Sequence, residues 1–289
     1  QTGKVITADM VEVKGPGKGL QPNCHAVLIG RTAKRDMKIG DFFYTSDIKD
    51  PVDVQRKYHF ERRWGVPVRY HDYSAIRNNS NLDFVEFHLS YKDMENDVRD
   101  IFKNKDVAGF TVHSPDLFKG DFLLNLASED KDCRKRSVME LQRVVDIALS
   151  LKPFFGESGR PKVIASLGGF SKNAPLPAHE LSKMYEMVAE GLSQLHADDV
   201  EILPQNLPPF PWYFGGQLFC NLFVDSKSTA QFCQTYGYKL CLDISHLKLT
   251  SNHRNSSFSD GIELLAPYTG HLHIVDAGGV DREGLQIGE

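Results

Sequence analysis

The residues best suited to chemistry lie in the C-terminal segment, where two apolar runs end in metal-binding side chains. The first run, Leu240 to Leu242, leads directly into Asp243 and His246, and the second contains His271 and His273. Carboxylate oxygens and neutral imidazole nitrogens are ligands for zinc, manganese or cobalt. Two histidines that are two positions apart on a strand also share one face. We therefore predict that this segment contributes to a divalent-metal centre (Mn, Zn, Co or Mg).

A structural interpretation of these residues stays open. The Asp of a D-x-x-H motif often caps a helix, and a single histidine is often a hydrogen-bonded core residue. Two such endings in succession, each after a strand that looks buried, favour a metal or substrate site.

Polar side chains also follow most of the other predicted strands. Glu86 and His88 fall on one face of their strand. Packing within a sheet does not require acids and imidazoles at strand ends, whereas in a parallel barrel these ends meet in one mouth. The further candidates at strand ends are His71, Glu86, His88, His113, Gln205 and Asn206.

From residue 65 onward, strand and helix patterns alternate, as in an α/β fold with a parallel sheet. We predict a (β/α)8-type TIM barrel over residues 65–289. Seven strands are predicted, and a complete barrel takes about 250 residues, so we expect the last βα unit to be missing. The predicted strands are Val66–His71, Phe84–Leu89, Gly109–His113, Lys162–Leu167, Val200–Leu203, Lys239–Asp243 and His271–Val275, and the clearest helices are Arg134–Leu151 and Ala178–Leu195.

Residues 1–50 read as a separate, small β-rich module with tight turns. Its K-G-P-G-K-G tract (Lys14–Gly19) does not predict a phosphate-binding loop, because Pro16 removes an amide donor and no strand–loop–helix pattern surrounds it. Residues 51–64 predict a charged linker helix that begins at Pro51.

Composition narrows the function classes. The net charge of −4 argues against a nucleic-acid partner, because phosphate contacts require a basic surface. The five cysteines show no regular spacing, which favours reduced thiols in a cytoplasmic protein. The apolar runs are too short to span a membrane.

Residues 3–48 resemble the SAF, or antifreeze-like, domain at the carboxyl end of sialic acid synthases. The resemblance rests on G-K-V-I-T-A-D-M, K-G-P-G-K-G and the L-I-G-R…K-R-D-M-K-I-G-D tract. It implies an N-acetylneuraminate synthase-type polypeptide with an upstream synthase domain, and a homodimer in which the domain covers the partner's active site. In that family an arginine of this loop reaches the amino sugar, but Gly15 stands at that place here.

Residues 65–289 resemble the xylose isomerase-like barrels, which include sugar isomerases, epimerases and endonuclease IV. The resemblance rests on V-H-S-P, D-I-S-H, H-L-H-I-V-D and E-G-L-Q-I-G-E. It implies that Gln205, Asp243 and His273 occupy metal-ligand positions, with a fourth ligand, a glutamate, on strand eight. In endonuclease IV-like members, His88, His113 and His246 would hold further zinc ions.

Gln205 departs from the family pattern, which usually has glutamate at this position. An amide oxygen can bind a cation, but it carries no charge and cannot take up a proton. Because the strand-eight glutamate is also absent from residues 65–289, we predict weak or absent metal binding.

These observations leave two functions, with a third that the charge disfavours. The first is a metal-dependent sugar or sugar-phosphate isomerase or epimerase; the second is a degenerate barrel that binds a sugar or serves as a scaffold; the third is an endonuclease IV-like hydrolase. The aromatic loop Pro208–Gly216 is either a sugar platform or a rigid cover. We assign His246, Glu86 and His113 to catalysis, His88, His71, Trp212, His271 and Asn206 to substrate binding, and Asp243, His273 and Gln205 to the metal.

Overall fold

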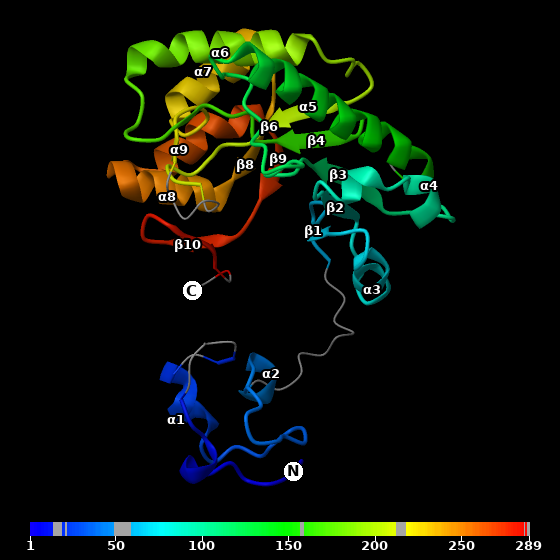
Figure 1. Cartoon of the computed structure of the whole chain (residues 1–289), viewed down its shortest axis with the longest axis vertical. Coiled ribbons are helices and arrows are strands. Elements are labelled where there is room, and N and C mark those ends of the chain that lie inside the picture. The colour runs from blue at the N-terminus through cyan, green and yellow to red at the C-terminus, as the bar shows by residue number, and fades with distance from the viewer. Residues whose placement is uncertain are drawn as a thin grey trace. The chain divides into compact units, whose positions relative to one another are not determined.

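The chain forms two compact units in a computed structural model that describes residues 1–13, 19–20, 22–48, 59–156, 159–211, 218–285 and 287. The first unit comprises Gln1–His59 with Asn79–Asn81, and the second comprises Phe60–Asn78 and Leu82–Glu289. Each unit is described by itself below (Figure 1).

The first unit contains short helical turns rather than strands. Its described residues form η1 (Ala8–Met10), η2 (Pro22–Cys24), α1 (His25–Leu28) and α2 (Thr45–Ile48), with one antiparallel bridge between Val5 and Thr32. The prediction of a β-rich module is therefore wrong for the described residues. Short loops stabilised by local bonds take the place of strands, as where Arg35 Nε lies 3.0 Å from Asp47 Oδ1.

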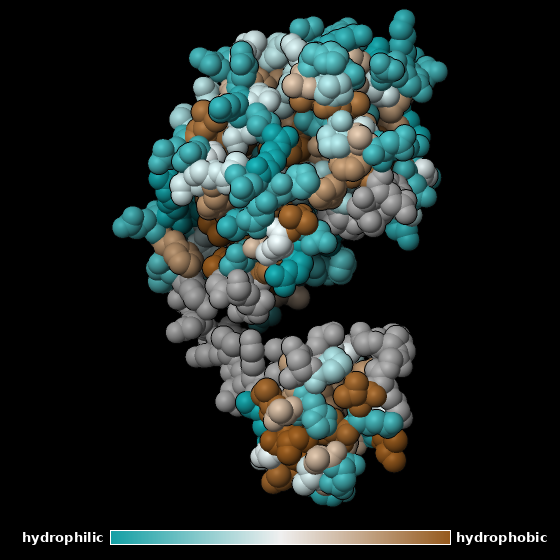
Figure 2. Space-filling model, turned by 90° about the vertical axis from the view of Figure 1, so that its left-hand side faces the viewer, coloured by the Kyte–Doolittle hydropathy of each residue, from teal (hydrophilic) through white to brown (hydrophobic). Residues whose placement is uncertain are grey.

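Hydrophobic side chains remain on the surface of this unit, as Figure 2 shows. Val5, Val13 and Ile39 are among its exposed large apolar residues. Of the predicted linker helix 51–64, residues 51–58 lie outside the described part of the chain and residues 59–64 form no helix.

The second unit is built on parallel strands, as the alternating pattern predicted. Five of them form one sheet in the order β1-β2-β3-β4-β6, and β8 and β9 form a parallel pair. A parallel bridge between Gln205 and Cys241 connects the end of β6 to β8. These strands are β1 (Gly65–Val68), β2 (Phe84–His88), β3 (Gly109–His113), β4 (Lys162–Ala165), β6 (Glu201–Pro204), β8 (Leu240–Asp243) and β9 (Thr269–His273).

This arrangement is a TIM-barrel-like α/β fold whose wall is not closed by the described strands. Among the described residues, β9 pairs only with β8 and β1 only with β2. The antiparallel pairs β5 (Phe170–Ser171) with β7 (Phe219–Cys220), and β10 (Asp276–Gly278) with β11 (Arg282–Leu285), were not predicted. They are too short to show a clear alternation in sequence.

The helices pack along the outside of the sheet (Figure 1). The longest, α5, shares one buried apolar cluster with side chains of the central strands, such as Val112 and Val163. Asp130, Asp225 and Ser257 cap the first turns of α5, α7 and α9. Gly237 ends α7 with φ 74°, a left-handed conformation that favours glycine. The helices are α3 (Tyr73–Asn78), α4 (Val98–Ile101), α5 (Lys131–Leu151), α6 (Ala178–Ser193), α7 (Ser226–Tyr236), α8 (Ile244–Arg254) and α9 (Phe258–Leu265), with 3-10 turns η3 (Asp93–Glu95), η4 (Lys152–Phe154) and η6 (Ala266–Tyr268). None of the described helices combines the length and the apolar character needed to cross a membrane.

Strand alternation separates the helix-facing core from the barrel interior. Val85 and Phe87 are fully buried in the main cluster, so Glu86 and His88 point to the opposite face. On that interior face, Ile164, Leu203 and Cys241 form a small apolar cluster of their own. Two residues further along β6 and β8, the interior positions are Gln205 and Asp243. The sheet therefore delivers its polar side chains to one end of the interior.

Candidate metal centre

A cavity of about 450 Å³ lies at the carboxyl ends of the strands. Side chains from β1, β2, β3, β8 and β9 and from the residue after β6 line it, and so do two residues of the β10–β11 hairpin, Glu283 and Gly284. Its polar lining includes Glu86, His88, His113, Gln205, Asp243, His246, His271, His273 and Glu283. Parallel barrels place their active sites at this end.

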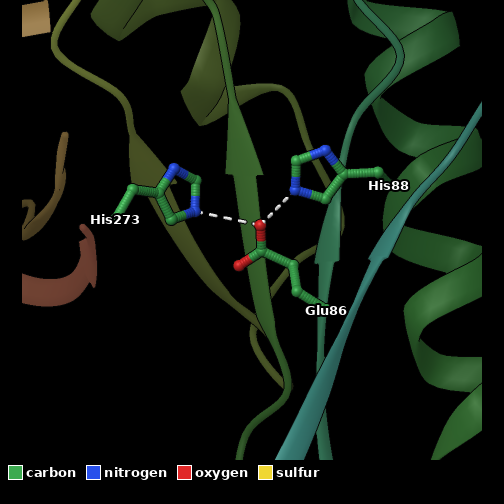
Figure 3. A group of neighbouring side chains, drawn as sticks. All are labelled: Glu86, His88 and His273. Atoms are coloured by element: carbon green, nitrogen blue, oxygen red, sulfur yellow. Dashed lines mark hydrogen bonds and ion pairs between the residues drawn. The ribbon is translucent and has the colours of Figure 1, made fainter. Parts of the chain in front are cut away.

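Glu86 is the most heavily contacted side chain of the cavity. Its Oε1 atom lies 2.6 Å from His88 Nε2 and 2.9 Å from His273 Nε2 (Figure 3). Its Oε2 atom lies 2.8 Å from His271 Nε2 and accepts a hydrogen bond of 3.0 Å from the Thr111 hydroxyl. Oε2 thus contacts His271 and Thr111, and Oε1 is shared by His88 and His273.

The electrostatics of this cluster favour a carboxylate at Glu86. Burial raises the pKa of Glu86, but His273, His271 and His88 outweigh burial and hold that pKa well below its usual value. Burial lowers the pKa of His273, whereas Cys241, Glu86 and Asp243 raise it above its usual range. An ionised acid therefore lies among groups that can exchange protons or bind a cation.

Three of these side chains fit a metal ion. Ligand atoms of Glu86, His88 and His273 all lie within 4.8 Å of one another. His273 Nε2 is buried and has no hydrogen bond of adequate geometry, although Glu86 Oε1 is 2.9 Å away. A buried nitrogen without a hydrogen-bond partner requires an explanation, and a cation bound by one carboxylate and two imidazoles supplies one.

Gln205 connects this group to the next strands. Its Oε1 is 2.9 Å from His113 Nε2, and its Nε2 donates to Asp243 Oδ2 over 3.1 Å. Burial and the neighbouring His88 lower the pKa of His113, and the two rings stack with centroids 4.5 Å apart. The predicted metal ligand Gln205 thus lies in the cavity, with both ends of its amide engaged by neighbouring side chains.

Asp243 caps a helix, as the D-x-x-H motif allowed, and it also lines the cavity. Its Oδ1 caps α8 by accepting from the His246 amide at 3.0 Å and from the Ser245 hydroxyl at 2.8 Å. Its Oδ2 faces His273 Nδ1 at 3.3 Å. Burial raises the pKa of Asp243, but His246 and His273 hold it below its usual value. Asn206 fixes the strand end through bonds to the Asp243 backbone.

A residue that the sequence prediction missed completes the cavity. Glu283, on β11, places Oε1 3.0 Å from His246 Nε2. His246 Nδ1 is 2.7 Å from the Asn206 carbonyl. Burial lowers the pKa of His246, but Asp243 and Glu283 raise it to about 9, so His246 is an imidazolium at neutral pH. The D-R-E-G tract carried no strand signal that could have placed Glu283 here.

Of the predicted substrate-binding residues, His71 and Asn206 do not line this cavity, and Trp212 falls outside the described part of the chain. The His71 side chain is 79% exposed and lies 3.9 Å from its neighbour Asp72; it does not line the cavity. Trp212 lies outside the described residues, as does most of the aromatic loop. His271 lines the cavity, but its Nε2 faces Glu86.

Comparison with known protein families identifies the family of this fold. The family described as "Xylose isomerase-like TIM barrel" matches residues 77–289. The chain belongs to this family. A search of curated proteins gives no match.

One solved structure shows the same fold at low identity, and two others have lower TM-scores. A D-tagatose 3-epimerase-like protein is 21% identical, with a TM-score of 0.53 over 78% of this chain and 80% of that chain. An L-ribulose 3-epimerase is 17% identical, with a TM-score of 0.48 over 73% of this chain and 69% of that one. Endonuclease IV from Thermus thermophilus is 15% identical, with a TM-score of 0.46 over 77% and 81%.

Proposed function

We propose that the barrel is a metal-dependent isomerase or epimerase acting on a small sugar. The observation that carries this proposal is that two clusters of ionised side chains adjoin in one cavity. The Glu86 cluster, suited to a cation, is joined through Asp243 to the His246–Glu283 pair, which can hold a proton. Sugar isomerisation requires these two functions side by side.

Glu86 Oε1, His88 Nε2 and His273 Nε2 are the atoms that would hold the metal. A bound dication would polarise a carbonyl or hydroxyl oxygen of the substrate. The sequence predicted weak or absent binding, because Gln205 carries no charge. Glu86 supports the opposite expectation, since it supplies a buried carboxylate from β2 within the same cavity.

Glu283 is the side chain that we assign to proton transfer at a substrate carbon. Its carboxylate lines the cavity and is 29% exposed, whereas Asp243 is almost buried. His246, fixed by Asn206, orients that carboxylate and stays protonated. Transfer of a proton from one substrate carbon to Glu283 gives an enediol; return of that proton to the neighbouring carbon, while a hydroxyl proton moves the opposite way between the two oxygens, interconverts aldose and ketose.

Titration and isotope exchange test this proposal together. Isothermal titration of the protein with Mn²⁺ should give one site, and His273→Asn should weaken it. With D-tagatose or D-fructose in D₂O, NMR should show deuterium entering the sugar. These probes follow from the D-tagatose 3-epimerase-like neighbour. Glu283→Gln should stop the exchange and leave Mn²⁺ binding intact. A wild-type protein that neither binds Mn²⁺ nor exchanges sugar protons would overturn the proposal.

A non-catalytic sugar-binding or scaffolding barrel is the second candidate. The observation in its favour is Gln205, an uncharged amide among the acids and imidazoles and bonded to His113 and Asp243. Sugar binding without deuterium exchange, in the presence of Mn²⁺, would favour it. The endonuclease IV-like hydrolase ranks third because of the net charge of −4.

We also propose that residues 3–48 are an SAF domain of an N-acetylneuraminate synthase-type polypeptide. This rests on the sequence resemblance of K-G-P-G-K-G and its flanking tracts. An assay of the whole polypeptide for N-acetylneuraminate formation tests the proposal, and sedimentation analysis tests the expected homodimer. Absence of synthase activity in a folded whole polypeptide would overturn it.

A further inference from the structure

Arg69 is the one lysine or arginine among the described residues that line the cavity. It follows the last residue of β1 directly. The β1–β2 register pairs Pro67 with Glu86 and Val68 with Phe87. The next position on each strand therefore brings Arg69 beside His88. Because alternate residues share a face, Arg69 belongs to the interior face that carries Pro67, next to the Glu86–His88 pair.

The guanidinium of Arg69 is incompletely satisfied. Its Nη1 atom is buried and has no hydrogen-bond partner. The nearest carboxylate oxygen, Asp93 Oδ2, is 3.6 Å away, which is too long for a hydrogen bond. That oxygen already accepts from the amide and hydroxyl of Ser90, at 2.8 Å and 2.7 Å. Asp93 thus lies near the guanidinium of Arg69 without accepting a hydrogen bond from Nη1.

Elsewhere in the cavity, His246 and His273 are already paired with Glu283 and Glu86. Glu86, Asp116, Asp243 and Glu283 all line the cavity. An anionic group on a ligand would therefore not be stable among these acids. Among the described residues that line the cavity, Arg69 combines a permanent positive charge with an N–H donor, Nη1, that has no acceptor.

We propose that Arg69 forms a subsite for an oxyanion carried by the substrate, so that the substrate is a phosphorylated or acidic sugar. This rests on the proposed sugar isomerase function. A planar guanidinium binds phosphate or carboxylate through parallel N–H donors. With the oxyanion at Arg69, the neutral carbons and hydroxyls of the sugar extend toward Glu86 and His88. A neutral sugar would leave Nη1 without a partner.

Paired ligands test the proposal and separate the two sources of the oxyanion. Affinities of the whole chain are measured for D-fructose 6-phosphate against D-fructose, and for D-glucuronate against D-glucose. We expect the wild-type protein to prefer at least one anionic ligand by about tenfold or more, as for a hydrogen bond to a charged group. Preference in the first pair alone identifies a phosphate, and preference in the second pair alone identifies a carboxylate.

Three variants locate that preference. Arg69→Gln should abolish it while changing the affinity for the neutral sugar less than twofold, and Arg69→Lys should keep part of it. Arg99→Gln is the matched control, because Arg99 is exposed, pairs with Asp97 and does not line the cavity. Thermal melts verify that each variant folds.

The outcomes separate this inference from the metal-dependent function. Any one of three results would overturn the Arg69 subsite. The wild-type protein could bind the anionic and neutral ligands equally, it could bind none of the four ligands, or the preference could survive in Arg69→Gln. Mn²⁺ titration of Arg69→Gln should match the wild-type protein. A wild-type protein that shows neither Mn²⁺ binding nor exchange of sugar protons would instead overturn the isomerase proposal, and the anion preference would remain measurable without metal.

Discussion

Two carboxylates of the barrel unit, Asp106 and Glu86, are both enclosed by donors, but the donors differ in kind. Asp106 accepts from the Arg77 guanidinium at 3.0–3.2 Å, from the Ala108 amide at 2.8 Å and from the Tyr73 hydroxyl. Glu86 contacts three imidazoles and one hydroxyl.

We propose that this difference separates a structural carboxylate, Asp106, from a functional one, Glu86. Arginine keeps its proton at all accessible pH values, so the Asp106 pair has one state near neutral pH and only stabilises the fold. Imidazoles can lose protons or bind a cation, so the Glu86 cluster has several states. Substitutions at these two sites should therefore affect different measurements.

The largest expected effect is the loss of metal binding in Glu86→Gln. The substitution removes the one carboxylate of the Glu86–His88–His273 group, and we expect the Kd for Mn²⁺ to rise by about 100-fold or more, about 2.7 kcal/mol. Isothermal titration measures the Kd, and Asp106→Asn, a carboxylate-to-amide change outside the cavity, is the control. An unchanged Kd in Glu86→Gln would show that the ion is held elsewhere.

Asp106→Asn should have the opposite profile: it should lower the stability of the fold and leave Mn²⁺ binding nearly unchanged. It leaves the guanidinium of Arg77, whose side chain is 21% exposed, without its counter-charge. We expect the free energy of unfolding to fall by about 2 kcal/mol, with the Kd for Mn²⁺ changed less than twofold. Urea denaturation monitored by circular dichroism provides the first value. Equal stability of variant and wild type would remove the contrast between the two carboxylates.

His271→Asn should have a smaller effect on the same metal site. His271 Nε2 holds Glu86 Oε2 at 2.8 Å and orients Oε1 toward His88 and His273. Loss of such a supporting contact weakens metal binding by about tenfold. A titration in which His271→Asn and Glu86→Gln lose equal affinity would make His271 a ligand rather than a support.

The smallest effect that we predict is a pH dependence of stability caused by Asp106. Burial raises the pKa of Asp106, but Arg77, the Ala108 amide and Tyr73 outweigh burial and hold it below its usual value. A lowered pKa in the folded state means that the carboxylate stabilises the fold above about pH 4 and that this contribution is lost as the pH falls further. Urea denaturation between pH 5 and 3 should show a shallower loss of stability in Asp106→Asn than in the wild-type protein. Parallel curves would contradict this prediction.

Local patterns in the sequence were sufficient for the parallel strands and for which of their residues share a face. Alternation placed Glu86 with His88 and His271 with His273, and the predicted strand Lys239–Asp243 is β8, Leu240–Asp243. Such predictions succeed because the pattern of a buried strand repeats every two residues. For the described residues of 1–50 the same reasoning predicted strands and was wrong, because short apolar stretches between turns suit a helical turn equally well.

Contacts between distant strands required the tertiary structure. No local signal indicates that Glu86 of β2 meets His271 and His273 of β9, because that contact depends on how the strands curve around the interior. The same holds for Glu283 beside His246 and for the unused donor of Arg69. The sequence by itself determined which residue types stand at the ends of the parallel strands and which face of each strand they occupy, since both depend on near neighbours along the chain. Only the folded structure decided which of those residues lie in contact with one another, since that depends on long-range packing.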